Sequence, residues 1–111
     1  MASELQRLKA DLFRGLAHPA RIRILELLVT KERSGLDLQA ALGLDQPAVS
    51  QHLAALRARQ LITTRKEGTT AYYALTTRIA ADLLRVARDL LSQRLTQSQS
   101  MLRELRREGR R

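Results

Sequence analysis

The sequence predicts a mainly α-helical chain with one two-stranded β-hairpin, an α+β fold class. Apolar residues recur at helical spacings of three and four through most of the 111 residues. The exception is a stretch at about 61–75, where two runs rich in β-branched and aromatic residues flank a glycine. A chain of this length has room for one hydrophobic core, so we expect residues 1–111 to form a single domain.

Three helices are predicted in the first part of the chain. The first, at about 3–16, has four leucines that share one face: Leu5, Leu8, Leu12 and Leu16. The second begins near Pro19, which fits a first helical turn because the N–H that proline lacks has no helical partner there. The third is short and ends at Gly43, since glycine adopts the left-handed conformation that ends many helices.

The fourth helix is predicted from Asp45 to about Arg59. Asp45 can cap its N-terminus, and Pro47 fits its first turn. Its apolar face consists of Val49, Leu53 and Leu56. Only Gly43-Leu44-Asp45 separates it from the third helix, so the two helices form a helix-turn-helix at about 35–59.

A hairpin and a long helix complete the chain. The hairpin at about 61–75 turns at Glu67-Gly68-Thr69. The last helix is predicted at about 78–107 and carries residues at alternating spacings of four and three, typical of a coiled-coil seam: Leu91, Leu95, Ser98, Leu102 and Leu105. We therefore expect a dimer that forms through the terminal helices at about 3–16 and 78–107.

A helix-turn-helix followed directly by a hairpin is a winged helix-turn-helix, a fold that binds double-stranded DNA. One face of the second helix is buried, and the N-terminal part of the other face enters the major groove. The residues that we expect at base edges are Gln46, Pro47, Ser50 and Gln51. The end of this helix and the hairpin tip supply the expected backbone contacts: Arg57, Arg65, Lys66 and Thr69. For His52, nearer the core, a phosphate contact and a structural hydrogen bond both stay open.

Charge and composition favour an anionic partner and argue against other classes. The net charge of +9 comes from 20 Lys and Arg against 11 Asp and Glu. No apolar run is long enough to span a membrane and no secretory signal is visible, so we expect a cytoplasmic protein without a membrane partner. We expect no enzyme, because Ser50 and His52 lie two apart on one helix and cannot face each other, and the glycines form no phosphate loop.

Three runs resemble the ArsR/SmtB family of bacterial transcriptional repressors. LFRGLAHPARIRILELL (12–28) is similar to the start of that family's second helix, and LGLDQPAVSQHLAALR (42–57) to its recognition helix. Lys66-Glu67-Gly68 followed by Tyr72-Tyr73-Ala74-Leu75 is similar to its wing. The resemblance covers about residues 8–95. It implies a homodimer joined through the first and last helices, a palindromic operator, and repression that a signal relieves.

The chain departs from the family's metal-sensing members. It has no cysteine, which also excludes a disulfide and a thiolate nucleophile. Asp82 and Asp89 lie on the last helix, but no histidine follows His52, and carboxylates alone make a poor zinc or nickel site. A lone histidine makes no site either, so we expect His18 to cap a helix or to face solvent. We therefore expect no metal and no cofactor; the signal is a small-molecule inducer, or there is none.

Two other classes stay open. A sequence-tolerant architectural protein could use the same basic face, and would then show no preferred DNA site. A helical protein-interaction module could use the last helix as a coiled coil, and would keep its partner when the fourth helix is altered. RNA binding is disfavoured because one Phe and two Tyr provide no platform on which single-stranded bases could stack.

Overall fold

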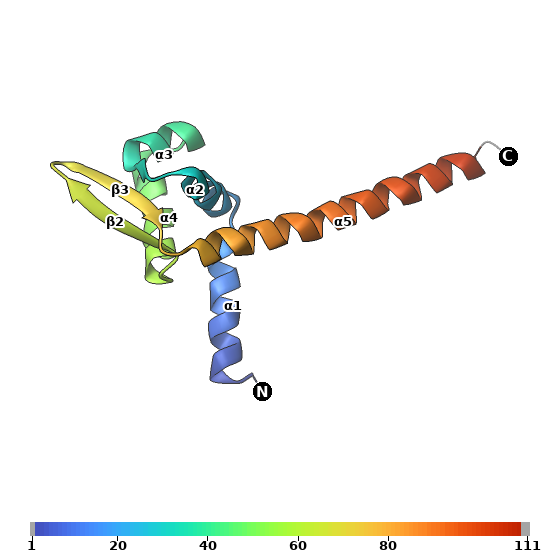
Figure 1. The fold of residues 1–111 in the computed structure, drawn as a ribbon, viewed down its shortest axis with the longest axis horizontal. Coiled ribbons are helices and arrows are strands. Elements are labelled where there is room, and N and C mark those ends of the chain that lie inside the picture. The colour runs from blue at the N-terminus through green and yellow to red at the C-terminus, as the bar shows by residue number, and fades with distance from the viewer. Residues whose placement is uncertain (1, 110–111) are drawn as a thin grey trace. The chain divides into compact units, whose positions relative to one another are not determined.

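The computed structural model describes residues 2–109. Its elements in chain order (Figure 1) are α1 (Glu4–Leu16), α2 (Pro19–Thr30), β1 (Arg33–Ser34), α3 (Gly35–Leu42), α4 (Gln46–Ala58), β2 (Ile62–Glu67), β3 (Thr70–Leu75) and α5 (Arg78–Glu108). The contacts divide the chain into two compact units, one that ends at Ala81 and one that begins at Asp82, within α5. The predicted class, mainly helical with a small antiparallel sheet, is confirmed.

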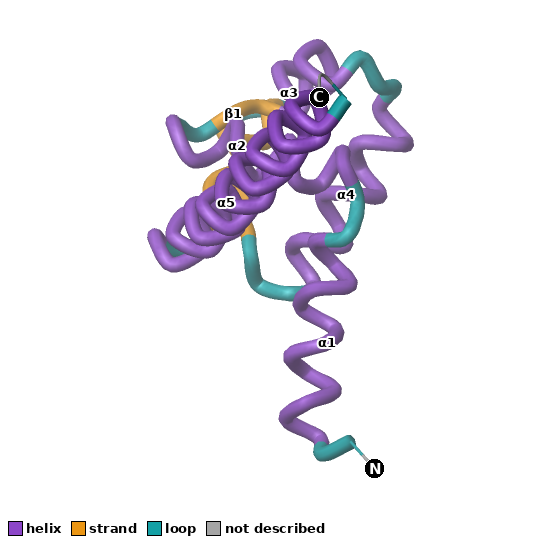
Figure 2. Tube along the Cα trace, turned by 90° about the vertical axis from the view of Figure 1, so that its right-hand side faces the viewer, coloured by secondary structure: helices purple, strands orange, loops and turns teal. Residues whose placement is uncertain are grey.

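The sheet has three strands, in the order β1-β3-β2, where the sequence predicts two. β2 and β3 form the expected antiparallel hairpin. β1, labelled in Figure 2, pairs with β3 on the side away from β2. In β1, Arg33 pairs with Tyr73 and Ser34 with Tyr72. A two-residue strand is too short to show an alternating pattern, so its pairing is set by tertiary contact with β3 and leaves no signal in the sequence.

The core of the first unit fixes the orientation of α4. Buried apolar side chains come from most elements: Leu16, Ile24, Leu25, Leu28, Leu38, Val49, Leu53, Leu56, Ile62 and Ala80. The three predicted for α4 are all among them, with exposed fractions of 2% for Val49, 4% for Leu53 and 0% for Leu56. Each such side chain contributes about 1.5–3 kcal/mol on burial. This apolar face therefore holds α4 with its opposite face toward solvent.

The turn between α3 and α4 follows the predicted signals. Gly43 ends α3 in the left-handed conformation, with φ of 65°. Asp45 caps α4, because its carboxylate Oδ1 accepts a hydrogen bond from the backbone N–H of Ala48 at 3.0 Å. Pro47 stands in the first turn, as predicted. The helix-turn-helix is thus defined by local chemistry at both sides of its turn.

The C-terminal end of α4 is fastened to α1 by Arg59. Its guanidinium donates to the backbone oxygen of Asp11 at 3.1 Å and to the Asp11 carboxylate at 3.2 Å. A Cβ on Gly15 would meet the side chain of Arg59, so glycine permits the close approach of the two helices. No role for Arg59 is predicted from the sequence, and the structure gives it one in holding α4.

In the second unit, α5 is half-buried at Leu83 and Leu84 and exposed beyond them. Every residue from Arg85 to Glu108 is solvent-accessible in this chain. The leucines of the predicted seam are 51–68% exposed. Within the described part of this unit, no other helix or strand packs over these apolar side chains.

Candidate nucleic-acid interface

The predicted base-reading residues lie on α4 outside the buried face of that helix. Gln46, Pro47, Ser50 and Gln51 are all exposed in the first unit. Arg57, in the last turn of α4, is exposed as well. None of these side chains is covered by the subunit itself. The N-terminal half of α4 therefore presents donors and acceptors to solvent, as reading a major groove requires.

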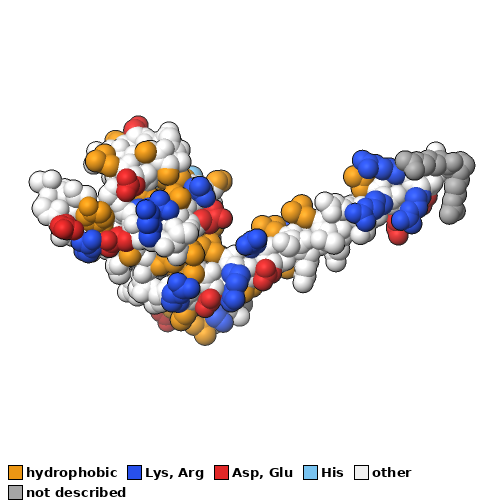
Figure 3. All heavy atoms as spheres, turned by 45° about the horizontal axis from the view of Figure 1, so that its top comes forward, with side chains coloured by type: hydrophobic (Ala, Val, Ile, Leu, Met, Phe, Trp, Pro, Cys, Tyr) orange, Lys and Arg blue, Asp and Glu red, His pale blue; other side chains and the backbone are white. Residues whose placement is uncertain are grey.

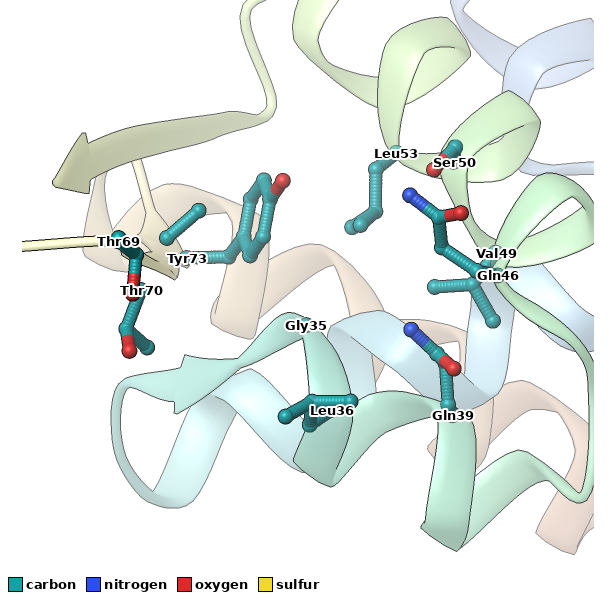
Figure 4. Close-up of a pocket in the computed structure, with 11 residues that line it drawn as sticks. Gly35, Leu36, Gln39, Gln46, Val49, Ser50, Leu53, Thr69, Thr70 and Tyr73 are labelled. Carbon is teal, nitrogen blue, oxygen red and sulfur yellow. The ribbon is translucent and has the colours of Figure 1, made fainter.

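A cleft of about 510 Å³ adjoins this face, between α3, the N-terminal half of α4 and the hairpin (Figure 4). Two amides and four hydroxyl groups line it: those of Gln39, Gln46, Ser50, Thr69, Thr70 and Tyr73. Three predicted DNA-contacting residues, Gln46, Ser50 and Thr69, thus share one cleft. The predicted set does not include Gln39, because the motif implies only a buried role for α3. The polar side chain of Gln39, shortly before the turn, is the signal in the sequence that could identify it.

On the hairpin, the two predicted phosphate-binding residues lie in different surroundings. Arg65 donates to both oxygens of the Glu32 carboxylate, at 2.9 and 2.6 Å, and to Glu67 at 3.0 Å. Its guanidinium also stands 4.6 Å from the ring centre of Tyr72. These hydrogen bonds raise the pKa of Arg65 above its usual value, and the one from Arg65 lowers the pKa of Glu32.

Lys66, the next residue on β2, is exposed and takes part in no ion pair among residues 2–109. Neighbouring residues of a strand point to opposite faces, so Lys66 does not share the surroundings of Arg65. A phosphate can approach Lys66 directly, whereas at Arg65 it has to displace a carboxylate. The two cations predicted as equivalent are therefore distinct in this structure.

His52 is half-buried and engaged with the start of α2. Its Nδ1 accepts a hydrogen bond from Nε of Arg21 at 3.2 Å. The ring of His18 stands against it, with 4.3 Å between ring centres and an interplanar angle of 58°. Burial first, and then the neighbouring His18 and Arg21, lower the pKa of His52. Of the two interpretations that the sequence leaves open, the structure contains the hydrogen bond.

The surface charge is mixed over the elements. Figure 3 shows Lys and Arg side chains (blue) interspersed with Asp and Glu (red) on the face in view. Among residues 2–109, no group of three or more His, Cys, Asp or Glu side chains is arranged to hold a metal ion. No described helix is both long enough and apolar enough to cross a membrane.

A winged helix-turn-helix that leaves the polar face of its second helix uncovered defines a class, the DNA-binding regulators. Comparison with known proteins agrees. The family model for bacterial regulatory proteins of the arsR family matches residues 18–64, from the N-cap of α2 into β2. An uncharacterized HTH-type transcriptional regulator of Mycobacterium tuberculosis, Rv0081, is 43% identical over 98% of this chain and 97% of its own length.

Solved structures give the same result. The crystal structure of Rv0081 superimposes with a TM-score of 0.83 at 41% identity, over 86% of this chain and 97% of that one. The homodimeric winged helix-turn-helix DNA-binding domain Mb0332 of Mycobacterium bovis has a TM-score of 0.76 at 28% identity, over 85% and 91%. The transcriptional repressor BigR of Xylella fastidiosa has a TM-score of 0.68 at 33% identity, over 73% and 83%. This chain belongs to the ArsR family and is a DNA-binding transcriptional regulator.

Proposed function

We propose that the chain is a homodimeric repressor that binds an inverted-repeat operator, with one α4 in each of two major grooves. The observation that carries the proposal is the exposure of the polar residues in the N-terminal half of α4, while three apolar residues of the same helix are buried in the core. The description of Mb0332 as homodimeric and of BigR as a repressor supports the assembly and the direction of regulation.

In this proposal the residues divide by what they contact. Gln46, Ser50 and Gln51 read base edges, since amides and hydroxyls match the pattern of the major groove. Pro47 packs beside them, while Thr69 and Gln39 approach the backbone from the cleft. Arg57 and Lys66 bind phosphates. Arg65 also binds a phosphate, once its hydrogen bonds to Glu32 and Glu67 are broken. His52 stays inside the subunit, where it accepts the hydrogen bond from Arg21.

The dimer is proposed to form through the first and last helices. On α1, Leu5, Leu8 and Phe13 are more than half exposed in the single chain. On α5, the seam leucines are exposed in the same way. Exposed apolar side chains at helical spacing mark interaction surfaces, and a two-fold dimer matches a palindromic site. A small-molecule inducer is the proposed kind of signal, because the chain has no cysteine for thiolate sensing.

The decisive experiment is the selection of binding sites from random duplexes. We expect an enriched inverted repeat whose half-sites lie about one helical turn, or a small multiple of it, apart. A reporter placed behind that site would then show lower expression when the protein is present. Binding without any enriched sequence would instead favour a sequence-tolerant architectural protein, and raised expression would contradict repression.

Replacing Gln51 by Ala tests base reading. We expect the binding free energy for the selected duplex to weaken by about 1–3 kcal/mol, because a bidentate base contact is lost. One base position of the selected site should then become degenerate. Lys66→Ala is the matched comparison: it should weaken all sequences alike and reduce the log–log salt slope by about one. Equal losses for Gln51→Ala on the selected and on random duplexes would contradict its assigned role.

A further inference from the structure

One guanidinium joins three helices next to the base-reading residues. Arg21, in the first turns of α2, donates from Nε to Nδ1 of His52 on α4 at 3.2 Å. It also donates from Nη1 to the backbone oxygen of Gly15, near the end of α1, at 3.2 Å. Within residues 2–109, the bond from Arg21 to His52 is the one side-chain hydrogen bond between α2 and α4.

The position of this bond along α4 matters. His52 directly follows Gln51, whereas the other polar connection of α4, from Arg59 to Asp11, lies at its C-terminal end. Around the exposed N-terminal half, the buried side chains of Val49 and Leu53 supply packing without a directional bond, and the hydrogen bond at Asp45 is made to the backbone of α4 itself. The Arg21–His52 bond is therefore the directional contact closest to the predicted base contacts.

The bond requires one protonation state of His52. Nδ1 can accept a hydrogen bond only when it carries no proton, so the neutral ring has its hydrogen on Nε2. Protonation would turn the acceptor into a donor that faces the guanidinium. The titratable and charged groups facing His52 are Arg21 and His18, both at the start of α2, and α1 contributes the Gly15 carbonyl to Arg21.

We propose that Arg21 and His52 are a positioning pair that holds the recognition helix in its base-reading orientation, and that they do so only while His52 is neutral. The proposal rests on the proposed function of α4. It makes His52 a positioning residue, acting through the orientation of Gln51 and Ser50. The lowered pKa of His52 agrees with it, because burial and two basic neighbours favour the neutral ring.

A pH dependence of specific binding follows. As pH falls through the pKa of His52, the fraction of protein with the bond intact falls. Apparent affinity for a specific duplex should then fall with that fraction and level off about five- to tenfold lower, the effect of losing one net hydrogen bond. Non-specific binding should not weaken, since added positive charge favours phosphates. The ratio of specific to non-specific affinity is therefore the informative quantity.

The first test uses the free protein. Nitrogen NMR of the histidine rings at pH 8 should show Nδ1 of His52 unprotonated and Nε2 protonated, with a pKa below the usual value of about 6.5. In Arg21→Ala the pKa of His52 should rise, whereas in Arg23→Ala, which removes a charge from the exposed side of the same helix, it should stay unchanged. A protonated Nδ1 at pH 8, or a pKa indifferent to Arg21, would overturn the proposal.

The second test measures affinity from pH 8 to pH 5.5 for a duplex selected by the wild-type protein, and for a random duplex of equal length. His52→Asn keeps an acceptor oxygen in the place of Nδ1 but cannot titrate. We expect the affinity ratio to fall on acidification for the wild type and to stay constant for His52→Asn. In Arg21→Ala the ratio at pH 8 should be about five- to tenfold lower than in Arg23→Ala, the size of one net hydrogen bond.

The outcomes separate the two proposals. If no duplex is selected at any pH, the proposed function fails, whatever the NMR experiment shows. If a duplex is selected but its affinity ratio falls equally in the wild type and in His52→Asn, the proposed function stands and the positioning pair is overturned. In the pH series the wild type and His52→Asn are each compared with themselves, so a change in the absolute affinity of His52→Asn does not affect that comparison.

Discussion

The side chain of Arg65, on the wing, is held by the carboxylates of Glu32 and Glu67. The residue type alone predicts a phosphate contact. The structure adds Glu32, which lies 33 positions earlier in the chain and accepts two hydrogen bonds from Arg65. An ion pair this exposed contributes little to stability, so its larger effect is on where the guanidinium points. Glu32 therefore competes with phosphate for Arg65.

Glu32→Gln tests that competition. The substitution removes the carboxylate that accepts two of the three hydrogen bonds from Arg65 and leaves only Glu67 to compete with a phosphate for the guanidinium. We expect tighter binding to any duplex and a log–log salt slope steeper by about one. Filter binding or fluorescence anisotropy over a salt series measures both. Glu26→Gln is the control, because Glu26 lies on the exposed side of α2 and pairs with Arg23 at 4.0 Å. An equal change of slope in both variants would show that net charge alone is responsible.

His52 also predicts how stability depends on pH. Its pKa is lower in the folded chain than in the unfolded chain, so the unfolded chain binds the proton first as pH falls. The stabilising contribution is complete above about pH 6.5 and is lost as pH falls through the folded pKa. Urea unfolding at pH 8 and pH 5.5 should show a larger loss of stability for the wild type than for His52→Asn. Equal losses would contradict the lowered pKa.

At the scale of elements, the sequence predicts correctly those features that depend only on residues close together in the chain. The cap at Asp45, the glycine that ends α3 and the apolar face of α4 all follow from residues within a turn or two of one another. β1 could not be predicted, because two residues become a strand only through pairing with β3, nearly 40 positions later. The recognition helix was thus accessible to sequence reasoning, and the third strand was not.

Asp45 gives a prediction for the recognition helix as an element. Asp45→Ala removes the acceptor for the N–H of Ala48 and should lower the free energy of unfolding by about 1 kcal/mol. Fraying of the first turn should also weaken specific DNA binding, because Gln46 is the first residue of α4. Asp45→Asn keeps a capping oxygen and should remain close to the wild type in urea unfolding. An Asp45→Ala variant as stable as the wild type would show that the cap contributes nothing.

At the scale of the whole molecule, the limit of sequence reasoning lies in contacts between distant residues. The sequence predicts every helix, the hairpin and an exposed polar face on α4. It does not reveal that Arg21 meets His52, 31 positions away, or that Arg59 meets Asp11, 48 positions away. Periodicity reports which face of a helix is apolar, but not which polar groups two packed helices bring together. The residues that hold the recognition helix therefore emerge only from the fold.

The seam on α5 gives the prediction for the assembled molecule. A dimer that buries Leu95 should lose about 1.5–3 kcal/mol of association free energy for each side chain truncated by Leu95→Ala. The dimer dissociation constant should then rise at least about tenfold, which sedimentation equilibrium measures directly. Gln97→Ala, an exposed position off the seam of the same helix, should leave it unchanged. Because two linked half-sites bind far more tightly than one, Leu95→Ala should also weaken binding to the full inverted repeat more than to a single half-site. Equal dissociation constants for the two variants would place the dimer contact elsewhere than on this seam.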